Sequence, residues 1–277
     1  MNVLSIDVGL KNLAFCLFHI RSQTDLSIKQ WDILNLCGKP RKCCSKTNKQ
    51  IKCDKTARFC KDGHYYCKIH GKKTSFKVPP QEFKEKIIKR KKVKDLKKLC
   101  AQFGISHNKK IKKDECLSLI QEYISTHYLD FVESINSADL SLTVLGRTMK
   151  HKFDEIFNDI TIDCVLVENQ VSPLANRMRI FQGMIIQHFI ERGCGQIHNI
   201  SARNKLKDFL GEKSLKTSYN ERKKLSIQFT TEMICNSNLF IKWDQFFLSH
   251  KKKDDLADSF LQGIWFLKNK KLIILKK

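Results

Sequence analysis

Four acidic residues at three distant places in the chain have surroundings that could bring them to one point. Asp7 and Glu168 each end a short apolar run typical of a buried strand, and Asp255 and Asp258 lie three residues apart in a segment with helical spacing. In sheets covered on both faces, functional groups collect at the carboxyl ends of the strands. Convergent carboxylates bind Mg²⁺, which removes the cost of burying like charges. The set therefore predicts phosphodiester hydrolysis with two divalent ions roughly 3.5 to 4 Å apart.

The residue types alone leave two alternatives open. Asp254 lies four residues before Asp258 and would share its helix face, so helical spacing does not choose between Asp254 and Asp255. Taken singly, Asp7 also fits a turn, Glu168 the start of a following helix, and the Asp pair the first turn of a helix.

A strong excess of basic residues characterises the composition. The 277 residues include 52 Lys and Arg against 28 Asp and Glu, a formal net charge of +24. Basic side chains release counterions from phosphates on binding, so a polyanion, above all nucleic acid, is the expected partner. We expect no membrane association, because no apolar stretch approaches the roughly 18 to 20 residues that a membrane span requires.

The start of the chain and its cysteines favour an intracellular, reducing compartment. No secretion signal or transit peptide is evident, because the first 18 residues lack a basic leader followed by an apolar run. Several of the 12 cysteines, among them Cys16, Cys164 and Cys235, lie in apolar patterns typical of reduced core thiols.

The order of predicted elements indicates an α/β fold. The predicted strands are 2–7, 13–19, 28–34, 162–168 and 196–200, and the predicted helices are 140–157, a segment opened by Pro173, 219–235 and 254–267. The first three strands are expected to be antiparallel, and the later ones parallel and separated by helices. This order gives a mixed sheet flanked by helices.

Three ordered motifs carry a resemblance to a known family. They are SIDVG at residues 5–9, VLVENQ at 165–170 and KKDDLADS at 252–259. Together they resemble the RuvC-like Holliday junction resolvases of the ribonuclease H superfamily. Within that group the pattern is most similar to the resolvases of poxviruses and other large DNA viruses and to the fungal mitochondrial type. The resemblance spans residues 1–36 and about 136–268.

The resemblance implies a ribonuclease H-like fold and a structure-selective endonuclease that depends on Mg²⁺, with Mn²⁺ as a substitute. It implies Asp7, Glu168, Asp255 and Asp258 as the catalytic ligands of two Mg²⁺ ions, and its Asp-x-x-Asp helix favours Asp255 over Asp254. It further implies a homodimer that makes paired nicks across branched double-stranded DNA, a four-way junction. A viral protein of this kind would act in the host cytoplasm or nucleus.

A block rich in cysteine and lysine interrupts this pattern, and residues 37–80 predict a small zinc-binding insertion. Cysteine and histidine are the usual ligands of structural zinc, and CKIH at 67–70 has a Cys-x-x-His spacing that lets both ligands reach one ion. A short segment with almost no apolar core needs such a staple, although free thiols in a lysine-rich loop are the alternative. The preferred ligands are Cys44, Cys53, Cys67 and His70, with Cys43 or Cys60 as substitutes.

Residues 81–130 predict a second insertion, two short helices joined near Gly104. The residues that face inward at helical spacing are Leu96, Leu99, Cys100, Leu117 and Ile120. The arrangement resembles the SAP DNA-binding motif, which fungal mitochondrial resolvases combine with the nuclease fold. A solvated helical hairpin is the alternative. The nuclease domain would then comprise residues 1–36 and 131–277.

Basic residues flank the proposed acidic site along the sequence. We expect them to contact phosphates and to position the duplex arms without reading base sequence. The candidates are Arg177, Arg179, Lys205, Lys223 and Lys253. For any one of them, an exposed residue that only keeps the chain soluble is the alternative.

Two other functions compete with junction resolution. One is a non-catalytic DNA-binding or scaffold protein on a ribonuclease H-like core, and the other is a related nuclease that acts on other branched DNA or on RNA/DNA. The second alternative stays open because a fold does not determine a substrate. Retention of all four acids favours an enzyme over a scaffold.

Overall fold

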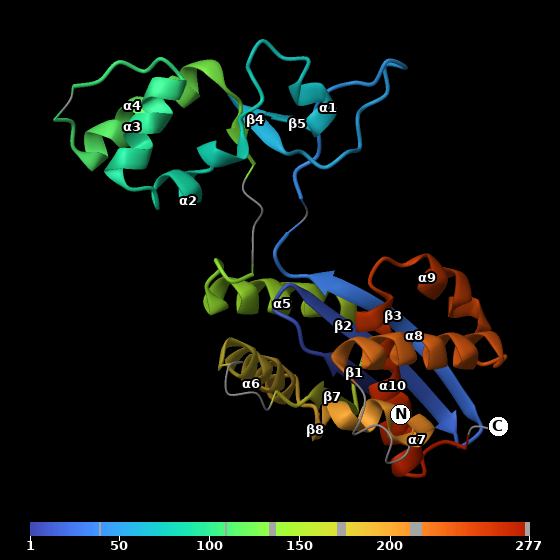
Figure 1. The fold of residues 1–277 in the computed structure, drawn as a ribbon. Coiled ribbons are helices and arrows are strands. Elements are labelled where there is room, and N and C mark those ends of the chain that lie inside the picture. The colour runs from blue at the N-terminus through green and yellow to red at the C-terminus, as the bar shows by residue number, and fades with distance from the viewer. Residues whose placement is uncertain (39, 109, 133–136, 171–175, 211–217, 275–277) are drawn as a thin grey trace. The chain divides into compact units, whose positions relative to one another are not determined.

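The chain folds into two compact units (Figure 1). The computed structural model describes residues 1–38, 40–108, 110–132, 137–170, 176–210 and 218–274. Unit 1 consists of Met1–Gly38 with Asn136–Lys277, and unit 2 of Lys39–Ile135. Among the described residues, no helix is both long enough and apolar enough to cross a membrane.

A five-stranded mixed sheet forms the centre of unit 1, in the order β3-β2-β1-β7-β8. The strands are β1 (Asn2–Asp7), β2 (Asn12–Ser22), β3 (Asp25–Asn35), β7 (Cys164–Glu168) and β8 (Gln196–Ile200). β1 and β3 both run antiparallel to β2, whereas β7 is parallel to β1 and β8 is parallel to β7. The predicted α/β fold with a mixed sheet is therefore confirmed.

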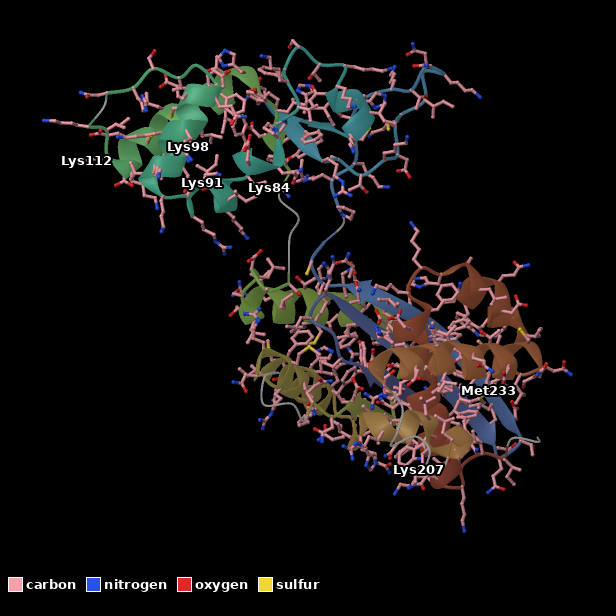
Figure 2. The ribbon with its side chains drawn as sticks, in the orientation of Figure 1. Lys84, Lys91, Lys98, Lys112, Lys207 and Met233 are labelled. Atoms are coloured by element: carbon pink, nitrogen blue, oxygen red, sulfur yellow. The ribbon has the colours of Figure 1, made fainter. Side chains whose placement is uncertain are left out.

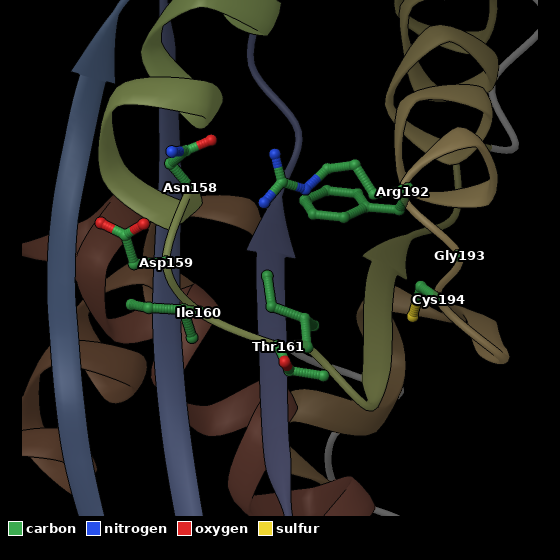
Figure 3. A pocket seen from close by; sticks show the side chains of 9 residues that line it. Asn158, Asp159, Ile160, Thr161, Arg192, Gly193 and Cys194 are labelled. Atoms are coloured by element: carbon green, nitrogen blue, oxygen red, sulfur yellow. The ribbon is translucent and has the colours of Figure 1, made fainter.

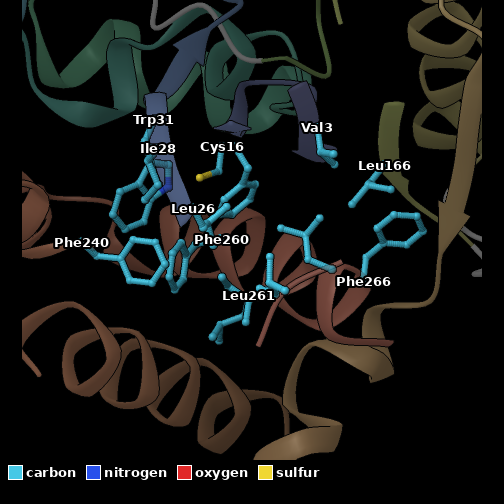
Figure 4. Packing of buried hydrophobic residues seen from close by; sticks show 14 of the residues in the cluster. Val3, Cys16, Leu26, Ile28, Trp31, Leu166, Phe240, Phe260, Leu261 and Phe266 are labelled. Carbon is cyan, nitrogen blue, oxygen red and sulfur yellow. The ribbon is translucent and has the colours of Figure 1, made fainter. Parts of the chain in front are cut away.

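Helices cover both faces of this sheet (Figure 1). The long helices are α5 (Leu142–Phe157), α6 (Asn176–Glu191), α8 (Tyr219–Cys235) and α10 (Lys253–Asn269). Leu4 and Val165 join the core under α5 and α6, whereas their neighbours Val3 and Leu166 join the core under α8 and α10, part of which Figure 4 shows. Side chains alternate along a strand, so β1 and β7 must be apolar on both sides, which explains their continuous apolar runs.

Several short elements of unit 1 were not predicted from the sequence. They are η3 (Ala202–Leu206), α7 (Lys207–Leu210), η5 (Ile241–Trp243) and α9 (Asp244–Ser249). Elements of one or two turns carry too few residues to show a helical period. The expected helix start at Pro173 lies outside the described residues, and α6 begins at Asn176.

A buried glutamine fixes α10 to the sheet. Gln262 is fully buried, and its amide nitrogen lies 3.1 Å from Ser5 Oγ, 3.2 Å from the Ile6 carbonyl oxygen and 3.3 Å from that of Leu166. Sliding or turning α10 would leave these buried groups unpaired, at a cost of about 1 to 3 kcal/mol for each. The contacts therefore set the position of every residue on α10, including Asp258 one turn earlier.

Unit 2 combines a small sheet with short helices. Its strands are β4 (Phe59–Lys61), β5 (His64–Tyr66) and β6 (Asp130–Phe131), and its helices are α1 (Lys68–Gly71), η1 (Gln81–Phe83), α2 (Glu85–Ile88), α3 (Val93–Gln102) and α4 (Lys113–His127). The sheet order is β5-β4-β6, so a strand that follows the helical segment pairs with a strand that precedes it. The two insertions expected at 37–80 and 81–130 thus share one sheet.

The core between α3 and α4 follows the expected helical pattern with one shift. Leu96, Leu99, Cys100 and Ile120 are buried, but Cys116 takes the buried position expected of its neighbour Leu117, which is only partly buried. The expected joint near Gly104 is present, because α3 ends at Gln102 and Gly104 has a φ of +66°, a conformation that favours glycine.

Gly263 allows α10 to lie against β2, and we expect Gly263→Ala to lower the free energy of unfolding of unit 1. A Cβ at this position would lie 2.2 Å from the Phe18 ring, which is fully buried. Overpacking costs about 1 to 3 kcal/mol, more than the gain of roughly 1 kcal/mol from replacing a helical glycine by alanine. Urea unfolding followed by tryptophan fluorescence measures the change, because Trp31, Trp243 and Trp265 all lie in unit 1.

Gly183→Ala in α6 is the matched control. Nothing lies within 4 Å of the added Cβ there, so this change is expected to leave unit 1 unchanged or up to about 1 kcal/mol more stable. Equal shifts of the two unfolding midpoints would contradict a steric limit at Gly263.

Candidate active site

The carboxyl ends of β1 and β7 lie side by side in the sheet. Their parallel register pairs Ile6 with Val167, so Asp7 and Glu168, the next residues, are neighbours at this edge. Asp258 approaches the same edge from the second turn of α10. The fold thus brings together three of the four acids that the sequence predicts, from segments far apart in the chain.

The side chain of Lys205 lies at the centre of these three acids. Its Nζ is 3.0 Å from Asp7 Oδ1, 2.9 Å from Glu168 Oε1 and 3.1 Å from Asp258 Oδ2, and only 4% of the residue is exposed. Lys205 belongs to η3, which follows β8 directly and so begins at the same edge of the sheet. A buried ammonium with three charge-assisted contacts holds the acids together.

Burial and charge shift the protonation of this cluster. Burial raises the pKa of Asp7 to about 7; Lys205 opposes the shift and Glu168 adds to it. Burial likewise raises the pKa of Asp258 against the attraction of Lys205. Burial would lower the pKa of Lys205, but Asp258, Asp7 and Glu168 overcome it and hold that pKa well above its ordinary value. The pKa shifts therefore favour a charged lysine, and the upward shifts of the two acids reflect the cost of enclosing several carboxylates around one ammonium, a cost that a further cation would reduce.

Asp254 and Asp255 have different surroundings. Asp254 Oδ2 lies 2.7 Å from Lys223 Nζ. Burial alone would raise the pKa of Asp254, but the ion pair with Lys223 outweighs burial and lowers this pKa. Burial and then the charge of Asp254 raise the pKa of Asp255 to about 6, and the charge of Asp7 adds to the shift. The ammonium groups of Lys252, at 3.8 Å, and of Lys223 offset this shift only in part. Asp255 therefore feels the negative charge of Asp254 and Asp7, while Asp254 forms an ion pair with Lys223.

Polar residues that the sequence did not single out hold two of the acids. The Gln170 side chain donates to Glu168 Oε2 at 3.1 Å, and its backbone N–H donates to Gln182 Oε1 at 3.0 Å. Ser226 of α8 is buried and forms a hydrogen bond with Asp258. One signal was available, because a polar residue on the buried side of a helix needs a partner.

The five basic residues expected to contact phosphates differ in exposure. The expectation is wrong for Lys205, which is buried among the acids, because η3 turns it inward. Arg177 is half-buried and donates to two backbone carbonyl oxygens just before α5. Lys223 forms an ion pair with Asp254. Arg179 is exposed and Lys253 half-exposed. Of the five, these last two have the accessibility that a phosphate contact requires.

A pocket lies at the opposite edge of the sheet (Figure 3). It has a volume of about 230 Å³, and its lining residues include Asn158, Thr161, Arg192 and Cys194, which precede β7 and β8. Arg192 is already held by Asp154, at 3.1 Å. In doubly covered sheets, ligands bind at the carboxyl ends of the strands, so the acid cluster and not this pocket is the candidate site.

A second cluster, of cysteine and histidine, lies in unit 2. The ligand atoms of Cys43, Cys53, Cys67 and His70 all lie within 4.8 Å of one another. Cys44, which the sequence prediction preferred, is exposed, and its thiol donates to the Tyr65 carbonyl oxygen instead. The preference for Cys44 is therefore corrected to Cys43, which was its substitute. Neighbouring residues of an extended segment point to opposite sides, so only one of the two cysteines can face the cluster.

Two protein-family models match this chain. A model described as "Mitochondrial resolvase Ydc2 / RNA splicing MRS1" matches residues 3–145, and a model described as "Poxvirus A22 protein" matches residues 120–270. Each match spans more than half of the chain. The chain belongs to the resolvase family of mitochondrial Ydc2 and poxvirus A22. The resemblance drawn from the three acidic motifs is thus confirmed.

Individual relatives are distant. An uncharacterized protein of Acanthamoeba polyphaga mimivirus is 26% identical over 317 aligned positions, which cover 96% of this chain and 74% of the relative. The yeast mitochondrial Holliday junction resolvase Ydc2 is 15% identical, with 98% of this chain and 81% of that one covered and a TM-score of 0.42. The fowlpox virus Holliday junction resolvase is 12% identical, with 98% and 99% covered and a TM-score of 0.44. Thermus thermophilus RuvC is 9% identical, with 99% and 100% covered and a TM-score of 0.44.

We expect Lys205→Met to lower the free energy of unfolding of unit 1 by about 3 to 5 kcal/mol in metal-free buffer. The change removes one partner of a buried ionic cluster and leaves three acids without their cation. Urea unfolding followed by tryptophan fluorescence measures it. Lys207→Met, two residues further and exposed (Figure 2), is the control and should shift stability by less than about 0.5 kcal/mol. Equal effects of the two changes would argue against a charge-balancing role for Lys205.

Proposed function

We propose that this protein is a Mg²⁺-dependent endodeoxyribonuclease that resolves four-way (Holliday) DNA junctions by paired hydrolysis of phosphodiester bonds. The observation that carries the proposal is the convergence of Asp7, Glu168 and Asp258 on the ammonium of Lys205, in a chain of the resolvase family. The net charge of +24 fits a polyanionic substrate.

The donor set of the acid cluster fits Mg²⁺. Asp7, Glu168, Asp255 and Asp258 offer carboxylate oxygens, the hard ligands that Mg²⁺ prefers and that Mn²⁺ also accepts. None of these side chains is more than 28% exposed, and one ammonium cannot balance four partly buried carboxylates. Two bound ions would supply an activated water and a stabilised leaving oxygen.

The residues of this chain prepare the site for that chemistry. Lys205 keeps the acids close together and reduces the negative potential that an incoming phosphodiester meets. Gln170 orients Glu168, and Gln262 holds α10 so that Asp258 faces the strand ends. These fixed contacts remove the cost of arranging the ligands during the reaction.

Resolution of a four-way junction requires two symmetric cuts. The described residues of one chain contain a single carboxylate cluster of this kind, so two coordinated cuts require two copies. We therefore propose that the protein acts as a homodimer on branched double-stranded DNA, with exposed basic residues such as Arg179 in contact with phosphates.

Zn²⁺ is the proposed second metal, without a role in the reaction. Cys43, Cys53, Cys67 and His70 offer sulfur and nitrogen donors, and a closed set of four such ligands leaves no open position for a substrate. Thiolate ligands must remain reduced, so we propose that the protein works in a reducing, intracellular compartment.

A non-catalytic scaffold explains the site less well. Buried acids destabilise a fold unless they serve a cation or a reaction, and a scaffold has no need of four. The clustering of the partly buried Asp7, Glu168 and Asp258 around the buried Lys205 thus supports catalysis.

We expect the protein to nick a synthetic four-way junction at symmetric positions in the presence of Mg²⁺ or Mn²⁺ but not after chelation. Asp7→Asn is expected to lower the cleavage rate by roughly 100-fold or more, equivalent to about 2.7 kcal/mol of transition-state stabilisation, because it removes a metal ligand. Gel electrophoresis of labelled strands maps the nicks, and gel-shift titration should show unchanged junction binding. Cleavage by Asp7→Asn at the original rate would contradict the role of Asp7 as a catalytic metal ligand. A single nick per junction would contradict the proposed homodimer.

Asp255→Asn and Asp254→Asn form a matched pair for the ligand assignment. Asp255 lies in the field of the acid cluster, so its loss should lower the cleavage rate by roughly 100-fold, which is about 2.7 kcal/mol, and raise the Mg²⁺ concentration that cleavage needs. Asp254 is already engaged in an ion pair with Lys223, and its loss should lower the cleavage rate by less than about tenfold. Rates measured over a Mg²⁺ titration separate the two, and the reverse order would make Asp254 the ligand.

A further inference from the structure

Few apolar side chains are buried in the first half of unit 2, and three of those are cysteine thiols. Cys43, Cys53 and Cys67 form a buried cluster of their own, separate from the apolar clusters of the chain. Thiols this small bury little apolar area, so they cannot stabilise a segment of this length by packing alone. A metal ion among them would supply the missing stabilisation.

Local backbone structure positions all four ligands. The Cys43 N–H donates to the Lys55 carbonyl oxygen and the Cys53 N–H to that of Ser45, so these two cysteines lie on paired arms of one loop. Cys67 caps the start of α1 and accepts from the His70 N–H at 3.5 Å, which explains the Cys-x-x-His spacing. His70 Nδ1 lies 3.3 Å from Cys43 Sγ and 3.5 Å from Cys67 Sγ. The set has the size and donors of a closed, tetrahedral zinc site.

The second half of unit 2 rests on the elements that carry these ligands. Cys67 follows β5, which pairs with β4, and β4 pairs with β6 beyond the helical segment. The Phe59 ring and the Leu129 side chain pack closely against Gly71 at the end of α1. A Cβ added to Gly71 would lie 2.9 Å from the Phe59 ring and 3.2 Å from the Leu129 side chain. Phe59 also packs on Phe131 of β6, with ring centroids 5.8 Å apart. The helix that holds His70 therefore lies against residues from both halves of the insertion.

Further contacts link this sheet to α4 and its core. Lys61 of β4 forms an ion pair with Asp130 and donates to the carbonyl oxygen of Ser125 in α4. Tyr128, directly after α4, pairs with Lys77 and packs its ring edge-on against Phe83 in the helical core, at 5.0 Å between centroids. A continuous path of backbone pairs and packed rings thus runs from the cysteine cluster to the core of α3 and α4.

We infer that one Zn²⁺ at Cys43, Cys53, Cys67 and His70 stabilises the whole insertion, including the helical half, so that both halves fold as a single unit. Binding of a structural metal contributes directly to folding free energy. The exposed lysines of the helical half, among them Lys84, Lys98 and Lys112 (Figure 2), depend on this fold for their arrangement. The part of the inference that concerns junction binding rests on the proposed function. Loss of zinc should weaken junction binding without altering the carboxylate site.

The experiment uses full-length protein and compares Cys43→Ala with Cys44→Ala. Cys43 faces the cluster and Cys44 does not, although they are adjacent. Elemental analysis should find one zinc per chain in the unmodified protein and in Cys44→Ala, and at most about a tenth of that in Cys43→Ala. Absence of zinc from the unmodified protein, including after incubation with Zn²⁺, would overturn the site.

Hydrogen exchange then tests the coupling independently of DNA. In Cys43→Ala, amides of β6 and α4 should exchange at least about tenfold faster, whereas those of β1 and β7 in unit 1 should be unchanged. Removal of zinc from the unmodified protein with a chelator, followed by its return, should reproduce and then reverse the effect. Loss of zinc with unchanged exchange in α4 would overturn the coupling.

Junction assays separate this inference from the proposed function. Cys43→Ala should bind a labelled four-way junction roughly tenfold more weakly but still cleave it at saturating protein and Mg²⁺, because the acids of unit 1 are untouched. Faster exchange in α4 with unchanged junction affinity would support the zinc-dependent fold and overturn the role of the insertion in DNA binding. Absence of cleavage by the unmodified protein would overturn the proposed function and leave the zinc result standing.

Discussion

Three carboxylates cannot be buried at one edge of a sheet unless positive charge lies among them, and the ammonium of Lys205 satisfies this constraint. The acids come from β1, β7 and α10, and the lysine from η3, so the cluster depends on four segments that are far apart in the chain. The parallel register of β1 and β7 and the Gln262 contacts of α10 fix the same edge. The insertion lies in the sequence between β3 and α5 and therefore does not interrupt any of these contacts.

The sequence was sufficient to predict the strand-end acids because each follows an apolar run that had to be buried on both sides. The sequence therefore predicted both the identity of Asp7 and Glu168 as site residues and their positions at the strand ends. The sequence was not sufficient for Lys205, because a lysine in a short polar segment after a strand has the same local pattern as any surface lysine. Its burial is decided by η3, five residues long, and by the charges it meets across the sheet. Long-range electrostatics of this kind leaves no periodic signal.

Other differences between sequence and structure have equally local causes. Cysteine composition predicted a metal cluster, but the choice between Cys43 and Cys44 depends on which side of an extended segment faces inward, and the pairing of Lys42 with Thr56 sets that orientation. Gln262 offered a stronger signal than was used, because it is a polar residue within an otherwise apolar stretch of α10. Such a residue must find buried partners, which here are the strands that end at the acid cluster.

The two candidate metal sites share no type of donor atom. The acid cluster offers carboxylate oxygens and the cluster of unit 2 offers three thiols and an imidazole, so each selects a different ion by ligand softness. Zinc binds most sites more tightly than magnesium does, and a closed sulfur-rich site that takes up zinc first leaves the open oxygen site to the more abundant magnesium. Separation of donor types therefore allows one chain to hold a structural ion and a reactive ion without exchange between them. It would also make the effects of the two proposed metals separable, because the proposed structural ion would act on the fold of unit 2 and the proposed reactive ions on cleavage in unit 1.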